Sequence, residues 1–393
     1  MTATKPESIW TKAFALVCLA EFLGYAQHAV LQPTFPLYIT SLGGSPLIVG
    51  LVIASFGVMS VVSRPILGYW ADRWSITGVM ILGLLAQAAS ISLCFIPFAG
   101  ATMLANGLRG IGWSGMNTGG YTLLAICAPA SRRGEASGYF GSAQAAATVF
   151  FPAVALWIIE AEFGGFHGAF FIAMSLVLIG AGAAYILSHQ TLPGSRSPYR
   201  ESNQSWWREI ISVFDRSILV AAALSFLLYL SLSCLTSFIV LYARQIGITH
   251  FSWYYVVIGA TSMLARPLLG RVSDKIPCGQ SLLIAFSLQS FALLIVPLVS
   301  NLAGAMVAGA LYFIGSAIGG ARIMSLAIEN APQERRARAL ASFSVAFPLS
   351  NGAGALLNGY VVDVAGYTWM YVLASALSAS GVLLTLKQWK NLR

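Results

Sequence analysis

The sequence carries little charge for its length. Asp, Glu, Lys and Arg make up 9% of the 393 residues, hydrophobic residues make up 58%, and the mean hydropathy is +0.77. Soluble domains carry about 25% charged residues, so this composition excludes an ordinary water-facing surface. Apolar runs of about 20 residues, the length that crosses a bilayer, recur along the chain. The sequence therefore predicts an all-α integral membrane protein.

Catalytic and metal-binding patterns are also missing. The five cysteines show no pairing or ligand spacing and are expected to be small packing residues. The sequence has no phosphate-binding loop, no His/Cys cluster and no nucleophile elbow. We therefore expect a protein that is not an enzyme and that binds no cofactor or metal.

The apolar runs predict twelve transmembrane helices. Glu21 within the first run and the lack of a convincing cleavage site argue against a removable signal peptide. The expected spans are residues 12–36, 47–69, 77–97, 101–126, 136–160, 167–188, 216–243, 250–270, 280–300, 302–328, 338–362 and 367–388.

The net charge of +9 is distributed to one side of this topology. Nearly all Lys and Arg fall on the same side of the membrane as the chain termini. Arg244 falls on the other side, and Arg109 and Arg322 lie inside spans. By the positive-inside rule, both termini are cytoplasmic. We expect a multi-pass protein of a prokaryote-like inner (plasma) membrane, whose partners are the bilayer and small molecules rather than nucleic acid.

The sequence contains an internal repeat. "SRPILGYWADRW" begins at Ser63, and "ARPLLGRVSDKI" begins at Ala265, 202 positions later. Two parallel copies of six spans are typical of transporters whose halves rock about a central site. We expect an N-terminal bundle over 1–188, a cytoplasmic linker with a short interfacial helix over 189–215, and a C-terminal bundle over 216–393.

The first copy resembles the G-x-x-x-D-R signature of the major facilitator superfamily (MFS), at Gly68, Asp72 and Arg73. A weaker copy lies at Gly270, Asp274 and Lys275. The resemblance covers the whole chain, although "WSIT" after Arg73 replaces the usual glycine and basic residues. It implies a monomeric transporter with two pseudo-symmetric six-helix bundles.

These motifs predict a cytoplasmic gate. Asp72 is placed to meet the N-terminal end of a helix from the other half, and Gly68 would let two helices approach closely. The alternative is a solvated turn with ordinary surface charges. The expected gate residues are Arg64, Gly68, Asp72, Arg73, Arg266, Gly270, Asp274 and Lys275.

Charged residues inside spans are functional candidates, because uncompensated charge at the bilayer centre costs at least about 2.5–3.5 kcal/mol. Glu21 shares a helical face with Tyr25, His28 and Gln32, and Arg109 shares one with Trp113, Asn117 and Gly120. We expect both faces to border one cavity, with Glu21, Arg109 and His28 serving proton coupling. Burial favours the neutral carboxyl and a nearby guanidinium favours the ionised one. The alternative is a static Glu21–Arg109 ion pair that pins two helices.

Further cavity walls follow from helical position. Arg322, seven residues before Glu329, is expected to form a gate or structural pair, or to contact the solute. The predicted cavity lining is rich in aromatic and amide groups and therefore suits an amphipathic or moderately polar solute. The other expected wall residues are Gln144 and Phe151 on span 5, Tyr229, Ser233 and Thr236 on span 7, and Phe347, Asn351 and Asn358 on span 11.

Three prolines bear on the direction of transport. Pro33 and Pro36 resemble the paired prolines that close span 1 in drug:proton antiporters, and Pro152 lies in the matching region of span 5. The resemblance implies proton-coupled efflux, with the proton gradient as the energy source. A proton-coupled uptake symporter or a uniporter of a small metabolite is the alternative.

Overall fold

The computed structural model describes residues 8–129, 132–161, 164–190, 219–273, 276–330 and 336–389. In these ranges every regular element is helical, and no strand occurs. The elements are α1 (Lys12–Ser41), α2 (Pro46–Arg73), α3 (Ile76–Ser92), η1 (Leu93–Phe95), α4 (Ala99–Cys127), α5 (Arg133–Glu160), α6 (Gly165–Ser188), α8 (Leu219–Leu230), η4 (Cys234–Phe238), α9 (Ile239–Gln245), α10 (Ser252–Ser273), α11 (Cys278–Ile295), η5 (Val296–Leu298), α12 (Leu302–Asn330) and α13 (Arg336–Lys387).

These elements supply the twelve predicted crossings. In the described part of the chain, nine helical segments are long and apolar enough to cross a membrane. One of them lies in α13, which contains two crossings because Gly366 leaves helical geometry at φ 85° and ψ 174°. Glycine adopts this conformation without a Cβ penalty. The remaining crossings are α10 and the more polar α4, which carries Arg109 and Asn117.

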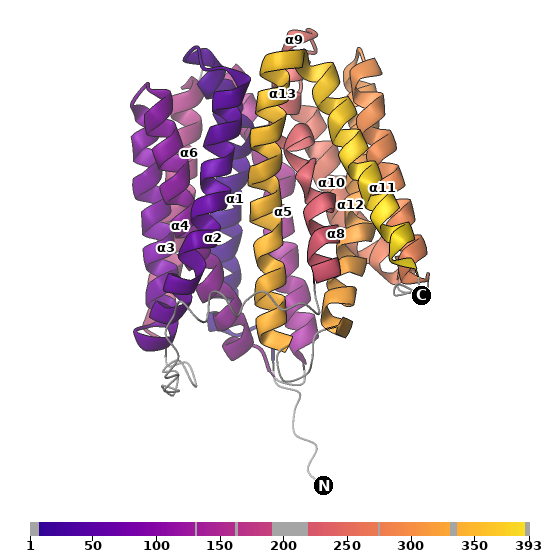
Figure 1. Ribbon diagram of the computed structural model, residues 1–393. Helices are drawn as coiled ribbons and strands as arrows, with labels where there is room; N and C mark the ends of the chain where they lie inside the picture. Colours follow the sequence, from indigo (N-terminus) through magenta and orange to yellow (C-terminus); the bar gives the residue numbers. More distant parts are fainter. Residues whose placement is uncertain are drawn as a thin grey trace.

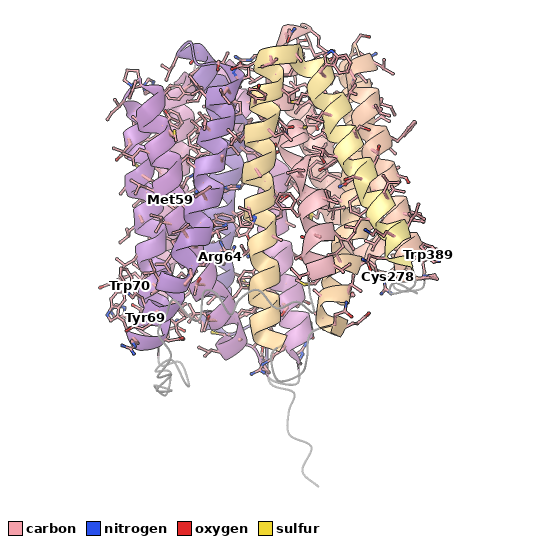
Figure 2. The ribbon with its side chains drawn as sticks, in the orientation of Figure 1. Met59, Arg64, Tyr69, Trp70, Cys278 and Trp389 are labelled. Atoms are coloured by element: carbon pink, nitrogen blue, oxygen red, sulfur yellow. The ribbon has the colours of Figure 1, made fainter. Side chains whose placement is uncertain are left out.

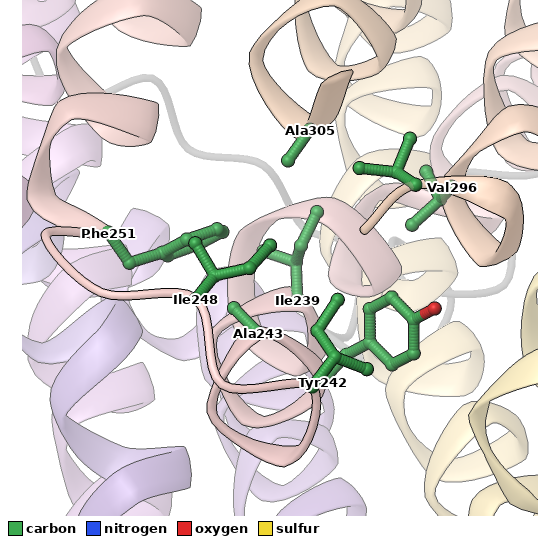
Figure 3. A pocket seen from close by; sticks show the side chains of 9 residues that line it. Ile239, Tyr242, Ala243, Ile248, Phe251, Val296 and Ala305 are labelled. Carbon is green, nitrogen blue, oxygen red and sulfur yellow. The ribbon is translucent and has the colours of Figure 1, made fainter. Parts of the chain in front are cut away.

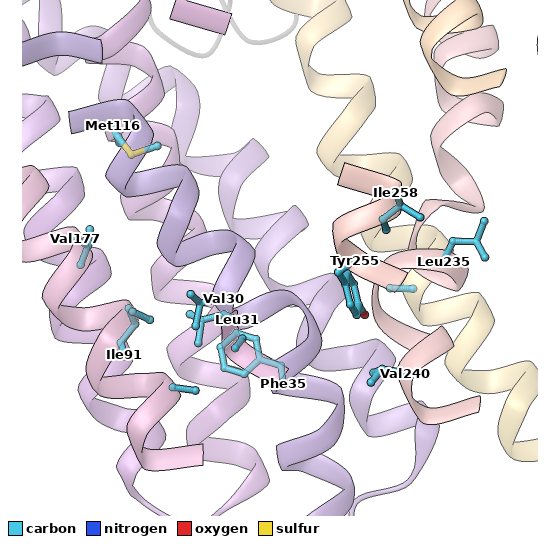
Figure 4. Close-up of a cluster of buried hydrophobic side chains, with 14 of the residues drawn as sticks. Val30, Leu31, Phe35, Ile91, Met116, Val177, Leu235, Val240, Tyr255 and Ile258 are labelled. Carbon is cyan, nitrogen blue, oxygen red and sulfur yellow. The ribbon is translucent and has the colours of Figure 1, made fainter. Parts of the chain in front are cut away.

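The helices form two groups that follow the chain, α1–α6 and α8–α13 (Figure 1). In the first half α1 packs on α5 and α6; in the second, α8 packs on α13. Figure 4 shows buried side chains of both halves, including Phe35 and Tyr255. We call the end where α1 begins and α13 ends the terminal end, and the opposite one the far end. The two-half fold matches the predicted class, whereas the linker lies almost wholly outside the described residues and its boundaries remain a prediction.

The two halves touch from the middle of the bundle to the far end. A methyl group at Gly50 or Gly57 of α2 would collide with backbone carbonyls of α13, so glycine permits this close approach. At the far end the Oγ of Ser45 donates to Asp363 at 2.8 Å. Nearer the terminal end, Tyr121 of the first half is 51% exposed and Phe347 of the second is 45% exposed. The space between the halves is therefore open at the terminal end.

The first helix is longer than its sequence predicts. It continues through Pro33 and Pro36 and ends at Ser41 rather than at residue 36. The hydroxyls of Thr34 and Thr40 donate to the carbonyls of Val30 and Pro36 at 2.6 and 2.8 Å. Because this stretch is buried in protein, the carbonyls that the prolines leave without an N–H donor do not face lipid.

Candidate functional site

Glu21 lies on the inner side of the first half and is fully buried. The Nε2 of Gln144, on α5, donates to its Oε2 at 2.9 Å, and its Oε1 has no hydrogen-bond partner among the described residues. Gly120 of α4 also packs against the carboxyl group, so closely that a Cβ at this position would collide with it. Three helices therefore enclose one carboxyl group with a single neutral donor.

The two polar helical faces predicted on spans 1 and 4 contact each other. The Tyr25 hydroxyl donates to the Oδ1 of Asn117 at 3.2 Å. The Trp113 ring lies 4.5 Å from the ring of Tyr25 and 4.7 Å from that of His28. Tyr25, His28 and Gln32 are partly exposed while most of their neighbours on α1 are buried, so this face borders the open space.

Arg109 has its own set of partners. Its Nε and Nη2 donate to the Oδ1 of Asn106 at 2.9 and 2.7 Å, and its Nη1 lies 3.1 Å from the Nδ1 of His28. The guanidinium also covers the Phe56 ring at 4.6 Å. Because a guanidinium only donates, the Nδ1 of His28 accepts and the ring proton of His28 lies on Nε2.

The expected direct contact between Glu21 and Arg109 is absent, so the predicted pairing, and with it the static ion pair, is wrong. The two helices are antiparallel, and Glu21 faces Gly120, eleven residues along α4 from Arg109. At 1.5 Å per residue this separation along the helix is about 16 Å. The carboxyl group and the guanidinium are thus two separate centres at different depths.

Arg64 lies nine residues before the end of α2 and is partly buried. Its guanidinium is within electrostatic range of Tyr25 and Tyr121. Figure 2 shows it on α2, nearer the middle of the bundle than Tyr69 and Trp70. The helix therefore carries it toward the central space, and its assignment to the cytoplasmic gate stays a prediction.

The remaining gate residues lie at the terminal end of α2 and α10. Asp72 and Arg73 are exposed, and the Arg73 guanidinium covers the Tyr69 ring at 4.3 Å. A Cβ at Gly68 would meet no atom within 4 Å, so the expected close helix approach is not made while this end is open. Arg266 and Gly270 lie on α10, whereas Asp274 and Lys275 lie outside the described residues.

Several predicted walls on the second half are buried instead. Ser233, Thr236 and Asn358 are all buried, and Asn358 donates to the Oγ of Ser233 at 2.8 Å. The prediction assumed an uninterrupted helix, but the π-helical η4 shifts the helical register after Ser233. The hydrogen bond between Asn358 and Ser233 joins α13 to the segment before η4, and the three buried residues do not line the cavity.

Other predicted wall residues are accessible: Phe151, Tyr229 and Asn351 are partly exposed, and Phe347 is exposed. The rings of Tyr229 and Phe347 lie 4.8 Å apart, and the Phe151 ring lies 5.9 Å from that of Phe22. The Oδ1 of Asn351 is buried without a hydrogen-bond partner in the described part of the chain. The Nη1 of Arg322 lies 4.0 Å from the Oε1 of Glu329, and its role in a gate, in a structural pair or at the solute stays a prediction.

The tyrosines around η4 are functional candidates that sequence reasoning missed. The hydroxyls of Tyr254 and Tyr255 donate to the carbonyls of Leu235 and Thr236 at 2.9 and 2.8 Å. They satisfy carbonyls that the irregular turn leaves free. Beside this segment, apolar side chains enclose a cavity of only about 10 Å³ (Figure 3), too small for a solute. The two adjacent tyrosines at the start of α10 were the feature of the sequence from which they could have been found.

Tyr312 lies 203 positions after Arg109, and "IGWSGMNTGG" from Ile111 aligns with "IGSAIGGARI" from Ile314 at the same offset. Its hydroxyl lies 2.9 Å from the Oγ of Ser231. The second half thus has a neutral phenol where the first has a guanidinium. Among the described residues no group of His, Cys, Asp and Glu is arranged to hold a metal ion.

Comparison with known proteins agrees with this arrangement. The chain is 25% identical to the "Staphyloferrin B transporter" of Staphylococcus aureus over 68% of this chain and 67% of the relative. It is 21% identical to "Multidrug resistance protein MdtG" of Proteus mirabilis over 94% and 93% of the two chains. A solved POT family transporter in complex with 5-aminolevulinic acid superposes with a TM-score of 0.80 at 12% identity, covering 96% of each chain. That structure supports the fold alone.

The sequence model of the Major Facilitator Superfamily matches residues 17–331, which is most of the chain. Together with the two-half helical fold and the transporter relatives, this match shows a transporter rather than an enzyme. The chain belongs to the Major Facilitator Superfamily.

Proposed function

We propose that this transporter exports a small amphipathic organic solute in exchange for protons. The buried carboxyl group of Glu21 carries the proposal, because its one hydrogen-bond partner is the neutral amide of Gln144. Ionising a buried carboxyl group without a cation costs several kcal/mol, whereas water lowers that cost. Proton binding can therefore depend on whether the open space reaches Glu21.

The arrangement of the halves supports alternating access. Contacts from Gly57 to the Ser45–Asp363 hydrogen bond close the far end, while Tyr121 and Phe347 are exposed nearer the terminal end. We assign the terminal end to the cytoplasm of a bacterial-type inner membrane, because Lys and Arg concentrate there. In this arrangement the central space is open inward, and Asp72 belongs to the gate that would close it.

The lining supports the choice of solute. Tyr25, Trp113 and Phe347 offer aromatic faces, and Asn117 offers an amide. Aromatic surface with a few polar groups suits an amphipathic molecule. Relatives named "Multidrug resistance protein MdtG" and "Multi-drug resistance efflux pump PmrA homolog" support export of organic solutes.

The alternative is a proton-coupled uptake symporter or a uniporter, and transport in oriented vesicles distinguishes the three. Everted vesicles expose the cytoplasmic face. An inside-acid gradient should drive the solute into everted vesicles if the protein is an antiporter. The same gradient should drive solute out of preloaded vesicles if it is a symporter, and should have no effect on a uniporter.

A further inference from the structure

We propose that Gln144 covers Glu21, that Tyr121 holds this cover in place, and that a solute with a hydrogen-bond acceptor opens it by taking the Tyr121 hydroxyl. This inference rests on the proposed function and adds a solute-operated step to it. It also narrows the solute class to molecules that join an apolar or aromatic body to a carbonyl, carboxylate or similar acceptor.

A chain of polar groups leads from the open space to Glu21. Tyr121 is 51% exposed, and its hydroxyl donates to the Oε1 of Gln144 at 3.5 Å. Gln144 in turn donates from Nε2 to Glu21 at 2.9 Å. Each end of one amide is thus held by a different group, and the amide lies between the exposed phenol and the buried carboxyl group.

The hydrogen bond from the Tyr121 hydroxyl to the amide of Gln144 is weak. A distance of 3.5 Å is at the limit for an O–H···O hydrogen bond, whose usual range is about 2.5–3.0 Å. A solute acceptor at normal distance would compete well for the same hydroxyl. Gln144 would then lose one of its two partners and could rotate away from Glu21.

The surroundings favour an electron-rich solute group at this place. The guanidinium of Arg64 lies within electrostatic range of Tyr121 and Tyr25, and its positive charge draws acceptors toward the phenol. The Tyr121 ring itself packs 5.3 Å from Phe140, so the ring is held while its hydroxyl changes partner.

The titratable neighbours of Glu21 are few. Tyr121 faces it from α4, and the thiol of Cys18 lies one turn earlier on α1. The neighbouring α5 contributes Gln144, and α6 packs Gly180 against the backbone of Ala20. No described cation neutralises the carboxyl group, so water that enters when Gln144 moves is the available proton acceptor. The proton leaves the Glu21 carboxyl group for that water as the solute binds, which is the exchange that an antiporter requires.

The test measures proton release on solute binding by the purified full chain in detergent, in weak buffer with a pH indicator. The probes are 1-naphthaleneacetamide, 1-naphthaleneacetate and 1-ethylnaphthalene, which share one aromatic body. We expect proton release with the amide and the carboxylate but not with the ethyl compound. Equal release with all three, or release with none, would overturn the proposal.

Two variants and one control assign the step to its residues. In Tyr121→Phe the half-maximal solute concentration should rise roughly three- to tenfold, the effect of one hydrogen bond. Fewer protons should also be released on solute binding, because the cover is already without its hold. Gln144→Asn, whose amide is too short to reach both partners, should lose the dependence of proton affinity on the solute. Tyr139→Phe, at another exposed tyrosine that packs on Trp10, should behave as the parent.

Unchanged release in a folded Tyr121→Phe or Gln144→Asn protein would disprove the cover and leave the proposed antiport standing. A parent protein that moves solute but never protons would instead disprove the antiport. A thermal unfolding midpoint close to that of the parent establishes that each variant is folded.

Discussion

The Nε2 of Gln144 lies 2.9 Å from the Oε2 of Glu21, although 123 positions separate the two residues. This hydrogen bond joins α5 to α1 inside the first half, whereas Arg109 bonds to Asn106 and His28 at another depth. The carboxyl group of Glu21 and the guanidinium of Arg109 therefore lie in separate hydrogen-bond networks, and this separation can be measured.

A double-mutant cycle tests that separation. The coupling energy between Glu21→Gln and Arg109→Lys should be within about 0.5 kcal/mol of zero, because the residues do not touch. The cycle between Glu21→Gln and Gln144→Leu should give about 0.5–3 kcal/mol. Reversible unfolding in detergent provides both values, and a large coupling between Glu21 and Arg109 would contradict the structure.

Arg109→Lys alone should destabilise the protein. Lysine keeps the charge but loses the two-pronged hydrogen bond to Asn106, so the free energy of unfolding should fall by about 1–3 kcal/mol. Arg132→Lys, at an exposed residue paired with Glu135, is the matched control and should stay within about 0.5 kcal/mol. Equal behaviour of the two variants would argue against the buried network.

Gly120→Ala should disturb Glu21 directly. The added methyl group would collide with the carboxyl group of Glu21, and overpacking typically costs about 1–3 kcal/mol. The penalty should shrink in a Glu21→Ala background, where the obstructing group is gone. Gly182→Ala, whose Cβ would meet nothing within 4 Å, should be neutral or slightly stabilising. A penalty that persists without Glu21 would place the clash elsewhere.

A reversible cross-link tests movement at the far end. Ser45 and Asp363 hydrogen-bond across the two halves, so Ser45→Cys with Asp363→Cys should form a disulfide. Oxidation should then abolish transport, because the halves cannot separate there, and a reductant should restore it. Each single variant controls for the oxidant. Transport at the parent rate by fully cross-linked protein would refute alternating access by this route.

Much of the fold could be predicted from the sequence. The apolar runs and the offset between "SRPILG" and "ARPLLG" predict two related halves, because length and hydropathy determine which segments cross a membrane. Within the site, the faces of Glu21 and Arg109 were predicted by helical periodicity. Their faces do meet, since α1 and α4 are in contact.

The rest depends on tertiary structure. Periodicity gives the face of a residue but not the depth of its partner, so the pairing of Glu21 with Gln144 rather than Arg109 was not predictable. The walls predicted at Ser233 and Thr236 were wrong because no local residue marks the π-helical turn at η4. The assignment of Arg64 to the gate, made by its motif, stays a prediction.

Asp72→Asn should impair transport without affecting expression or folding. Asp72 is exposed while the terminal end is open, so it stabilises no contact in this state, and its carboxylate is needed when that end closes. Solute uptake by proteoliposomes, beside thermal unfolding of the same preparation, checks both parts. Normal transport kinetics in the variant would contradict a role for Asp72 in the gate.

The central claim is that Glu21 carries the transported proton. The most direct measurement is solute-driven proton movement in proteoliposomes with an internal pH dye and a panel of amphipathic solutes. The parent and Glu135→Gln, a variant of an exposed surface carboxylate, should both move protons. Glu21→Gln should move none while still binding solute. Proton movement at the parent rate in Glu21→Gln would contradict the account.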